Sequence, residues 1–246
     1  DQRHMGVELG FKVPLPVQGL SVEGALSWGE YIYTSTPLVT QTVDNSAEVI
    51  LENAEVPYWK SHPIYKKDEF GNYLNVDGGI WDPTTGISTV AVEKEQKHYV
   101  PSTPQFAADL GLNYRTKSYW FFEIDAQYFA NSYLDMNPGY RTDYAVSGPD
   151  GVLTPVEMEY MAAQEKFKPA FLLNASIGKS WYIDRKYNFG FSMNIQNITN
   201  NRNVKTGGYE QTRLIDSASA ERFYRFDSKY FYMQGLNYML NLYLRF

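Results

Sequence analysis

Residues 236–246 read Leu236-Asn237-Tyr238-Met239-Leu240-Asn241-Leu242-Tyr243-Leu244-Arg245-Phe246, and their side chains alternate in character. Every even-numbered position is aliphatic or aromatic, whereas Asn237, Asn241 and Arg245 fall at odd-numbered positions. A period of two is that of a β-strand, because successive side chains of a strand point to opposite faces of the sheet. These residues therefore predict a strand with one apolar face and one polar face.

Six further segments alternate in the same way, which makes seven predicted strands. Each is roughly ten residues long, the length of a tilted strand that crosses a bilayer. Their apolar faces carry no charged residue or amide, whereas Glu8, Lys12 and Arg115 fall on the opposite faces. Lipid explains this separation, because a Lys or Arg that faces the middle of a bilayer costs about 2 to 4 kcal/mol. The six segments are 5–13, 20–29, 106–115, 120–131, 171–178 and 187–196.

The connections between these segments are alternately short and long. Short turns occupy 14–19, 116–117 and 184–186, and long connections run over about 34–104, 132–168 and 199–230. Because each strand reverses the direction of the chain, all short turns are expected at one end of the sheet and all long loops at the other, as in outer-membrane barrels. The predicted fold class is therefore all-β, an antiparallel transmembrane β-barrel. A soluble β-sandwich also alternates apolar and polar residues and is the alternative.

Composition sets further limits. The net charge is −6 and Lys and Arg do not cluster, which argues against a nucleic-acid partner. Cys is absent, so no disulfide or thiolate site is expected. No apolar run approaches the roughly 18 residues of a spanning helix, so a membrane location requires strands. Because single-chain barrels of this kind have an even number of strands, we expect the chain to be a fragment whose remaining strands lie elsewhere.

Four segments resemble parts of known outer-membrane proteins. Residues 238–246, with a final aromatic and apolar residues at every second position, resemble the terminal insertion signal of that class. Residues 194–200, Asn-Ile-Gln-Asn-Ile-Thr-Asn, are similar to the penultimate-strand motif of TonB-dependent transporters, although Ile198 and Thr199 stand where the family often has Leu and Phe. Residues 100–105 and 206–211 are similar to elements of the same family.

The resemblance implies a barrel of about 22 strands around a plug, with residues 1–246 forming its last seven strands as part of one domain. It implies active import of a scarce nutrient, such as a ferric chelate, haem, cobalamin or a glycan, energised through TonB. The implied location is the outer membrane, with the C-terminus in the periplasm and the long loops outside the cell. The implied partners are outer-membrane lipid, the protein's own plug domain and remaining barrel strands, the TonB complex and a surface lipoprotein. No cofactor and no enzymatic activity are implied.

The candidate site residues form three groups. Aromatic and basic side chains of the long loops could stack on a sugar or clamp a ferric chelate. These ligand-binding candidates are Tyr58, Trp59, Trp81, Tyr140, Arg141, Tyr209, Arg213 and Arg222. The candidates expected to face the lumen and plug are Glu23, Asp109, Glu123, Asp125 and Arg245. The candidates for the membrane-insertion signal are Tyr238, Leu240, Leu242, Leu244 and Phe246.

Local signals predict some structure inside the loops. Thr154-Pro155-Val156-Glu157 is a capping box with Pro at the first helical position, which predicts a helix from 155 to about 166. The pair Asp150-Gly151 predicts the turn of a hairpin in the same loop.

Other functions are less favoured by the residues. His4, His62 and His98 are scattered, so no metal site is predicted. Glu123 and Asp125 lie on one strand face and are better explained as salt-bridge partners of a plug or an opposite wall than as a catalytic pair. A passive porin or adhesin barrel and a soluble carbohydrate-binding sandwich remain alternatives, and an enzymatic barrel is a distant one.

Overall fold

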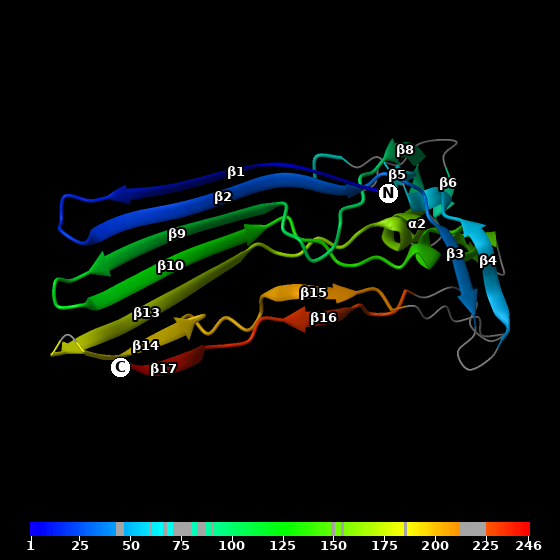
Figure 1. The fold of residues 1–246 in the computed structure, drawn as a ribbon. Helices are drawn as coiled ribbons and strands as arrows, with labels where there is room; N and C mark the ends of the chain where they lie inside the picture. The colour runs from blue at the N-terminus through cyan, green and yellow to red at the C-terminus, as the bar shows by residue number, and fades with distance from the viewer. Residues whose placement is uncertain are drawn as a thin grey trace.

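One antiparallel sheet of seven strands organises the chain (Figure 1). The structure is a computed structural model that describes residues 1–42, 47–59, 61–65, 68–70, 80–82, 87–89, 91–148, 151–153, 155–184, 186–211 and 225–246. The strands follow one another across the sheet in chain order, as β1 (Gln2–Pro14), β2 (Leu20–Tyr33), β9 (Phe106–Arg115), β10 (Trp120–Ala130), β13 (Ala170–Ile183), β14 (Tyr187–Gln196) and β17 (Asn237–Arg245). All seven predicted strands are confirmed, and the all-β prediction is confirmed with them.

The two ends of the sheet differ, as the lengths of the connections predict. Figure 1 shows the short turns after β1, β9 and β13 together at one end, where the chain also finishes after β17. The long connections all leave from the opposite end, next to the N-terminus. The prediction that short and long connections are segregated is therefore confirmed.

One face of this sheet is apolar from edge to edge. The register places Leu9 beside Leu26, Leu112 beside Ile124, and Phe191 beside Leu242, so the apolar rows of neighbouring strands are continuous. These side chains are not packed against other parts of the described chain, since Leu9 is 63%, Ile124 50% and Leu242 77% exposed. A sandwich would bury this face against a second sheet. We call it the apolar face, and the opposite side of the seven-stranded sheet the polar face.

The last strand places its predicted insertion-signal residues on the apolar face. Each of Tyr238, Leu240, Leu242, Leu244 and Phe246 is more than half exposed. Tyr238 pairs with Ile195 and Leu244 pairs with Phe189 on the neighbouring strand β14, so the alternation at the end of the chain continues the apolar row of its neighbour.

Charged residues join the apolar rows just beyond the predicted segments, at the two ends of the sheet. Strand β13 runs five residues beyond the predicted segment, to Ile183, and brings Lys179 into register with Trp120 and Phe191. At the opposite end, Glu30 lies beside Met5 in the same row and pairs with Arg3 at 2.7 Å and with Lys97. Strands β2 and β13 are therefore longer than their uncharged apolar rows, and the charged residues lie at the ends of the strands.

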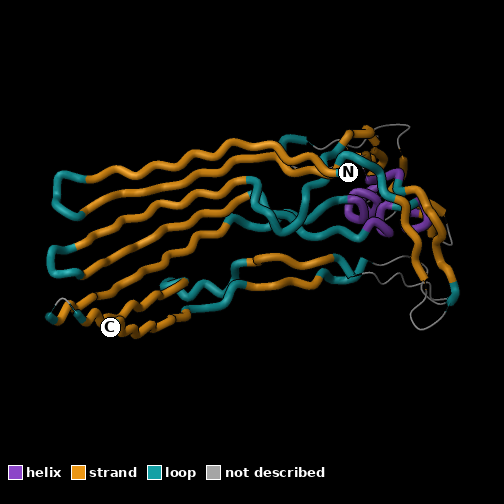
Figure 2. Tube along the Cα trace, in the orientation of Figure 1, coloured by secondary structure: helices purple, strands orange, loops and turns teal. Residues whose placement is uncertain are grey.

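The long connections contain their own small elements, which together form a cap, defined as the described residues within 34–105, 131–169 and 197–236. Figure 2 shows that every helix lies in this cap, at the end away from the short turns. No helix in the described ranges is long and apolar enough to cross a membrane. The first connection holds β3 (Leu38–Thr42), β4 (Val49–Glu55), η1 (Pro57–Trp59), β5 (Ser61–Tyr65), β6 (Ile80–Asp82), β7 (Ile87–Thr89) and β8 (Ala91–Glu95). The second holds η2 (Pro138–Arg141), α1 (Asp143–Val146), β11 (Ser147–Gly148), β12 (Gly151–Val152) and α2 (Pro155–Ala162), and the third holds β15 (Lys205–Tyr209) and β16 (Lys229–Tyr232).

The predicted helix and hairpin both occur in the second connection. Strands β11 and β12 form a hairpin in which Gly151 of the predicted turn is paired with Gly148 instead, and Asp150 lies outside the described residues. Helix α2 begins at Pro155 but ends at Ala162, about one turn before the predicted end; Thr154 of the capping box lies outside the described residues. The helix stops where the guanidinium of Arg141 donates hydrogen bonds to the carbonyl groups of Ala162 and Ala163, at 3.1 and 2.9 Å. Cations favour this position, because the last carbonyls of a helix are unpaired and carry partial negative charge.

The buried side chains of the described chain gather in the cap. Two apolar clusters lie within it, one around Tyr140 and Met161 and one around Val56 and Trp59. A third cluster joins Leu172, on the polar face of β13, to Val204 of the third connection. The cap is therefore packed onto the loop end of the polar face.

The motif at 194–200 has a structural role in this architecture. Asn197 ends β14 with a positive φ of 52°, a conformation that Asn tolerates better than most residues. Its buried side chain donates to the carbonyl groups of Asn201 and Gln234 at 3.0 and 2.9 Å and accepts from the Asn201 amide at 3.0 Å. Asn197 thus ties both ends of the third long connection together, just before the chain enters β17.

Candidate functional site

The five predicted lumen residues lie on the polar face. Gly111 of β9 is paired with Glu23 of the neighbouring strand β2 and with Asp125 of the neighbouring strand β10. Asp109 of β9 is paired with Ala25 of β2. Glu123 pairs with Asn113, and Arg245 lies beside Asn188 at the edge of the sheet. The structure therefore brings four of them, Glu23, Asp109, Glu123 and Asp125, together on three adjacent strands and leaves Arg245 apart.

Gly111 provides the space in which these carboxylates gather. A Cβ atom at this position would lie 3.1 Å from Asp125 Oδ1 and 3.3 Å from Glu23 Cγ. Lys12 of β1 neutralises one member of the group, since its Nζ lies 2.7 Å from Glu23 Oε2. The remaining acidic side chains make this part of the polar face negative, so it suits a cationic or hydrogen-bonding partner.

Two hollows lie along the polar face. One of about 420 Å³ is lined by Glu8, Ser27, Asp109, Gln127 and Phe129. A larger one of about 600 Å³ lies nearer the cap, where small residues of β1 and β2 meet side chains of the long connections. Its lining includes Gly6, Gly29, Gln105, Asn131, Tyr133 and Lys166. The polar face thus has room for a partner from the central part of the sheet up to the cap.

Stacked tyrosines form one wall of the larger hollow. The Tyr99 and Tyr133 rings are 4.1 Å apart and nearly parallel, at 8°. Burial raises the pKa of the Tyr133 phenol above its usual range, and the neighbouring Tyr99 adds to the effect. Gln105, in the 100–105 segment, accepts a hydrogen bond from the Tyr31 amide at 2.6 Å, which fixes this segment against β2.

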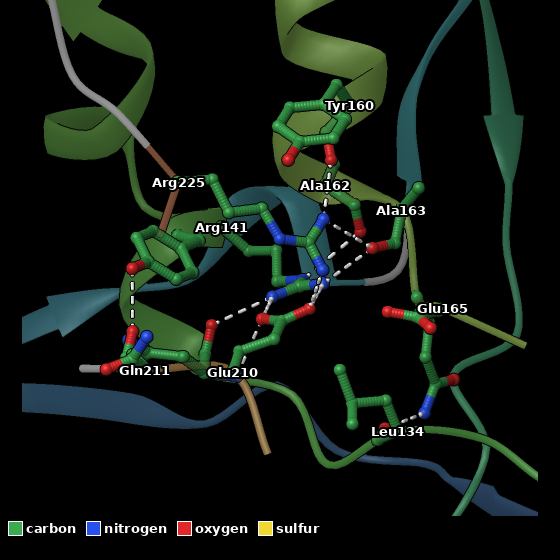
Figure 3. Close-up of polar contacts among 12 residues, drawn as sticks. Leu134, Arg141, Tyr160, Ala162, Ala163, Glu165, Glu210, Gln211 and Arg225 are labelled. Atoms are coloured by element: carbon green, nitrogen blue, oxygen red, sulfur yellow. Dashed lines mark hydrogen bonds and ion pairs between the residues drawn. The ribbon is translucent and has the colours of Figure 1, made fainter. Parts of the chain in front are cut away.

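Arg141, a predicted ligand-binding residue, is fully buried in the cap (Figure 3). Its guanidinium donates to both carboxylate oxygens of Glu210, one of them at 3.0 Å, and to the carbonyl groups of Asn137, Ala162 and Ala163. A guanidinium has five N–H donors, and these contacts use all of them. Arg141 therefore fastens the cap together and has no free donor for a ligand.

Glu210 is shared by a second arginine. Arg225 donates to Glu210 Oε1 and to the carbonyl of Tyr160 at 2.7 Å, and it lies over the Tyr160 ring at 5.3 Å (Figure 3). The Asn137 amide donates to Glu210 Oε2 at 2.9 Å. Sequence reasoning did not single out Glu210 or Arg225, because no local pattern distinguishes them from exposed charges. We call Arg141, Glu210 and Arg225 the cap clamp.

The other ligand-binding candidates occupy different environments. Tyr140 is buried and its hydroxyl donates to the carbonyl of Gln211 at 2.6 Å; burial raises the pKa of this phenol. Trp59 is buried and stacks on His98 at 5.0 Å, and Tyr58 packs against the cluster around Tyr140. Tyr209 is 45% exposed on β15 and is available to a partner.

Three candidates cannot be placed in this way. Arg213 and Arg222 lie outside the described residues, and for Trp81 the structure describes only the backbone, in β6.

A second polar cluster ties the third connection to the second. Lys205 Nζ lies 2.8 Å from Glu165 Oε1 and 3.4 Å from the centre of the Tyr230 ring, and the Tyr230 hydroxyl donates to Glu165 Oε2 at 2.7 Å. Burial and the Glu165 carboxylate raise the pKa of the Tyr230 phenol. A hollow of about 260 Å³ lies beside this cluster, and its lining includes Tyr160, Gln164, Glu165, Arg225 and Asp227.

Comparison with known proteins adds no assignment, since no protein-family model and no curated protein matches this chain.

Proposed function

We propose that this chain forms the last seven strands of an outer-membrane β-barrel that imports a scarce nutrient and is energised through TonB. The single observation that carries the membrane part of the proposal is the apolar face. It extends over all seven strands and is exposed along them, while between the two ends of the sheet the charged side chains of the strands lie on the opposite face. Lipid is the partner that suits such a face, because exposure of so large an apolar surface to water would be unfavourable.

In a membrane, both edges of the sheet would need further strands as partners, as in a closed barrel. β1 and β17 each have one neighbouring strand among the described residues. In hydrocarbon, an open edge would leave backbone N–H and C=O groups without partners, at several kcal/mol each. The proposal therefore requires further strands that pair with β1 and β17.

The cap and the polar face support transport rather than a purely structural role. The cap holds most of the buried side chains and sits at the end of the sheet from which the long connections leave. The two hollows lead from the cap along the polar face toward the acidic group. In a closed barrel the polar face lines the lumen, so a nutrient bound at the cap would enter beside these hollows.

The short turns are then periplasmic and the cap extracellular. Outer-membrane barrels have short periplasmic turns and longer extracellular loops, which matches the two ends of this sheet. The motif similarities at 100–105, 194–200 and 206–211 favour the TonB-dependent family within this class. A ferric chelate, haem, cobalamin and a glycan are the nutrient classes to compare.

A growth and uptake experiment tests the proposal. The gene's full reading frame is deleted, and uptake of each nutrient class is compared between the deletion strain, the complemented strain and a strain without TonB. We expect uptake of one class to be lost in both deletions and restored by complementation. Uptake that survives without TonB would indicate a passive porin, and recovery of the protein without detergent in the soluble fraction would contradict a membrane barrel altogether.

A further inference from the structure

Lys179 is a cation on the apolar face of the sheet. It belongs to β13 and is level with Trp120, the first residue of β10, so it lies at the short-turn end of the strands. The residues around it in the same face are Trp120, Phe191, Ile177 and Trp181. None of these neighbours is acidic, and Lys179 forms no ion pair with any described residue.

Two tryptophan rings hold the ammonium group in place. Lys179 Nζ lies 4.8 Å from the centre of a Trp120 ring and 5.3 Å from that of Trp181, both within the range of a cation–π contact. The Trp181 ring is itself stacked on Phe189, at 4.7 Å and 6°. The aromatic rings therefore fix the position of the charge without neutralising it.

We infer that Lys179, Trp120 and Trp181 form a binding site for the phosphate diester of a glycerophospholipid headgroup. This inference rests on the proposed function, which places the short turns on the periplasmic side and hence this site in the inner leaflet of the outer membrane. Tyr114 and Tyr187 lie at the same end of the same face, as expected of an interfacial aromatic girdle. The lysine stem crosses the apolar surface while its ammonium reaches the headgroup level, where phosphate is the anion present.

Charge complementarity selects this occupant. The acyl chains of a phospholipid cover the apolar rows on either side of Lys179, and its phosphate supplies a counter-charge, which the described residues do not offer here. The indole N–H groups of the two tryptophans are additional donors of the kind that favours the membrane interface. A lipid without phosphate, such as diacylglycerol, can cover the apolar rows but cannot pair with the Lys179 ammonium.

Native mass spectrometry of the full protein tests the site. The protein is purified in a maltoside detergent, which contains no phosphate, and titrated with phosphatidylglycerol or with diacylglycerol of the same acyl chains. Three variants are compared with the unmodified protein: Lys179→Gln removes the charge, Lys179→Arg retains it, and Lys12→Gln removes a charge from the polar face. Heat-modifiable migration in gel electrophoresis confirms that each variant is folded.

We expect Lys179→Gln to weaken phosphatidylglycerol binding about tenfold, which corresponds to about 1.4 kcal/mol. Lys179→Arg and Lys12→Gln should bind as the unmodified protein does, and diacylglycerol should bind equally weakly to all four. Equal phosphatidylglycerol binding by the unmodified protein and Lys179→Gln would overturn the inference, as would an equal loss in Lys12→Gln. If the protein is folded in micelles and needs detergent, failure of the lipid site leaves the proposed function standing. A protein that is soluble without detergent would contradict both the lipid site and the proposed function.

Discussion

The guanidinium of Arg141 donates to both carboxylate oxygens of Glu210, a residue 69 positions further along the chain. Both side chains are completely buried. Arg141 belongs to the second long connection and Glu210 to the third, so this pair joins two loops that the sheet alone would leave independent. Binding residues on loops need such support, because loops without buried contacts open easily.

Neutralising Glu210 should loosen the cap. In Glu210→Gln the two buried arginines lose the carboxylate that they share. Breaking a buried ion pair from one side costs about 3 to 5 kcal/mol. We expect hydrogen exchange of residues 205–211 and 137–142 to become faster, with no change in β9 and β10. Exchange measured by mass spectrometry on the folded protein gives this comparison directly.

Glu30→Gln is the matched control for Glu210→Gln. Glu30 also receives two cations, Arg3 and Lys97, but its side chain is 29% exposed and those of the cations 47% and 55%. Exposed ion pairs contribute about 0 to 1 kcal/mol, so this substitution should change exchange little. Equal effects of the two substitutions would show that the cap clamp does not depend on its burial.

Alkaline pH should destabilise the cap. Burial raises the pKa of the Tyr133, Tyr140 and Tyr230 phenols. Above about pH 10, where an ordinary phenol ionises, the unfolded cap releases protons that the folded cap retains. The free energy of unfolding therefore stays constant below about pH 10 and falls as the pH rises through the raised values. Near-ultraviolet circular dichroism across an alkaline titration measures this loss.

Tyr140→Phe should reduce that pH dependence. The variant removes one buried phenol and the hydrogen bond of 2.6 Å to the Gln211 carbonyl, which costs about 1 kcal/mol at neutral pH. Its stability should then fall less steeply in the alkaline range than that of the unmodified protein. An identical alkaline profile would mean that Tyr140 ionises as freely in the folded cap as in the unfolded one.

Gly190 should tolerate no side chain. A Cβ atom there would lie 2.4 Å from the Lys179 carbonyl oxygen and 2.5 Å from the Tyr243 hydroxyl, so the backbone of β13 would have to shift. We expect Gly190→Ala to destabilise the folded sheet by about 1 to 3 kcal/mol in urea unfolding. Gly10→Ala, on the polar face of β1, is the control, since the nearest atom to its Cβ would be 3.9 Å away. Similar stability of both variants would contradict the close approach of β13 and β14.

The strands could be predicted from the sequence because their signal is local. A period of two over segments such as 106–115 and 187–196 needs no knowledge of the neighbours, and the alternation of short and long connections then predicts the end of the sheet at which each connection lies. The extension of β13 was missed because Lys179 interrupts the apolar row, and its aromatic neighbours come partly from β10 and β14.

The site was harder to predict, because its contacts join distant segments. The end of α2 depends on Arg141, 21 residues before it, and on Arg225, 62 residues after Ala163. Charge alone does not reveal that Arg141 is buried with all its donors used, so the sequence predicts it as a ligand-binding residue. Sequence patterns identify which loops carry aromatic and basic residues, but only packing decides which of these side chains remain available.

Site-directed spin labelling tests the central claim most directly, namely that lipid covers the apolar face. Residues 1–246 contain no Cys, and any Cys elsewhere in the full protein is replaced by Ser. Leu26→Cys and Ser27→Cys then each place one label at adjacent positions of β2, on the apolar and the polar face. With the full protein in bilayers, we expect the label at 26 to collide with oxygen, which dissolves in lipid, and to be shielded from a water-soluble nickel complex. The label at 27 should show the opposite preference. A label at 26 that is reached by the nickel complex, or that is shielded from both reagents by protein, would contradict the account.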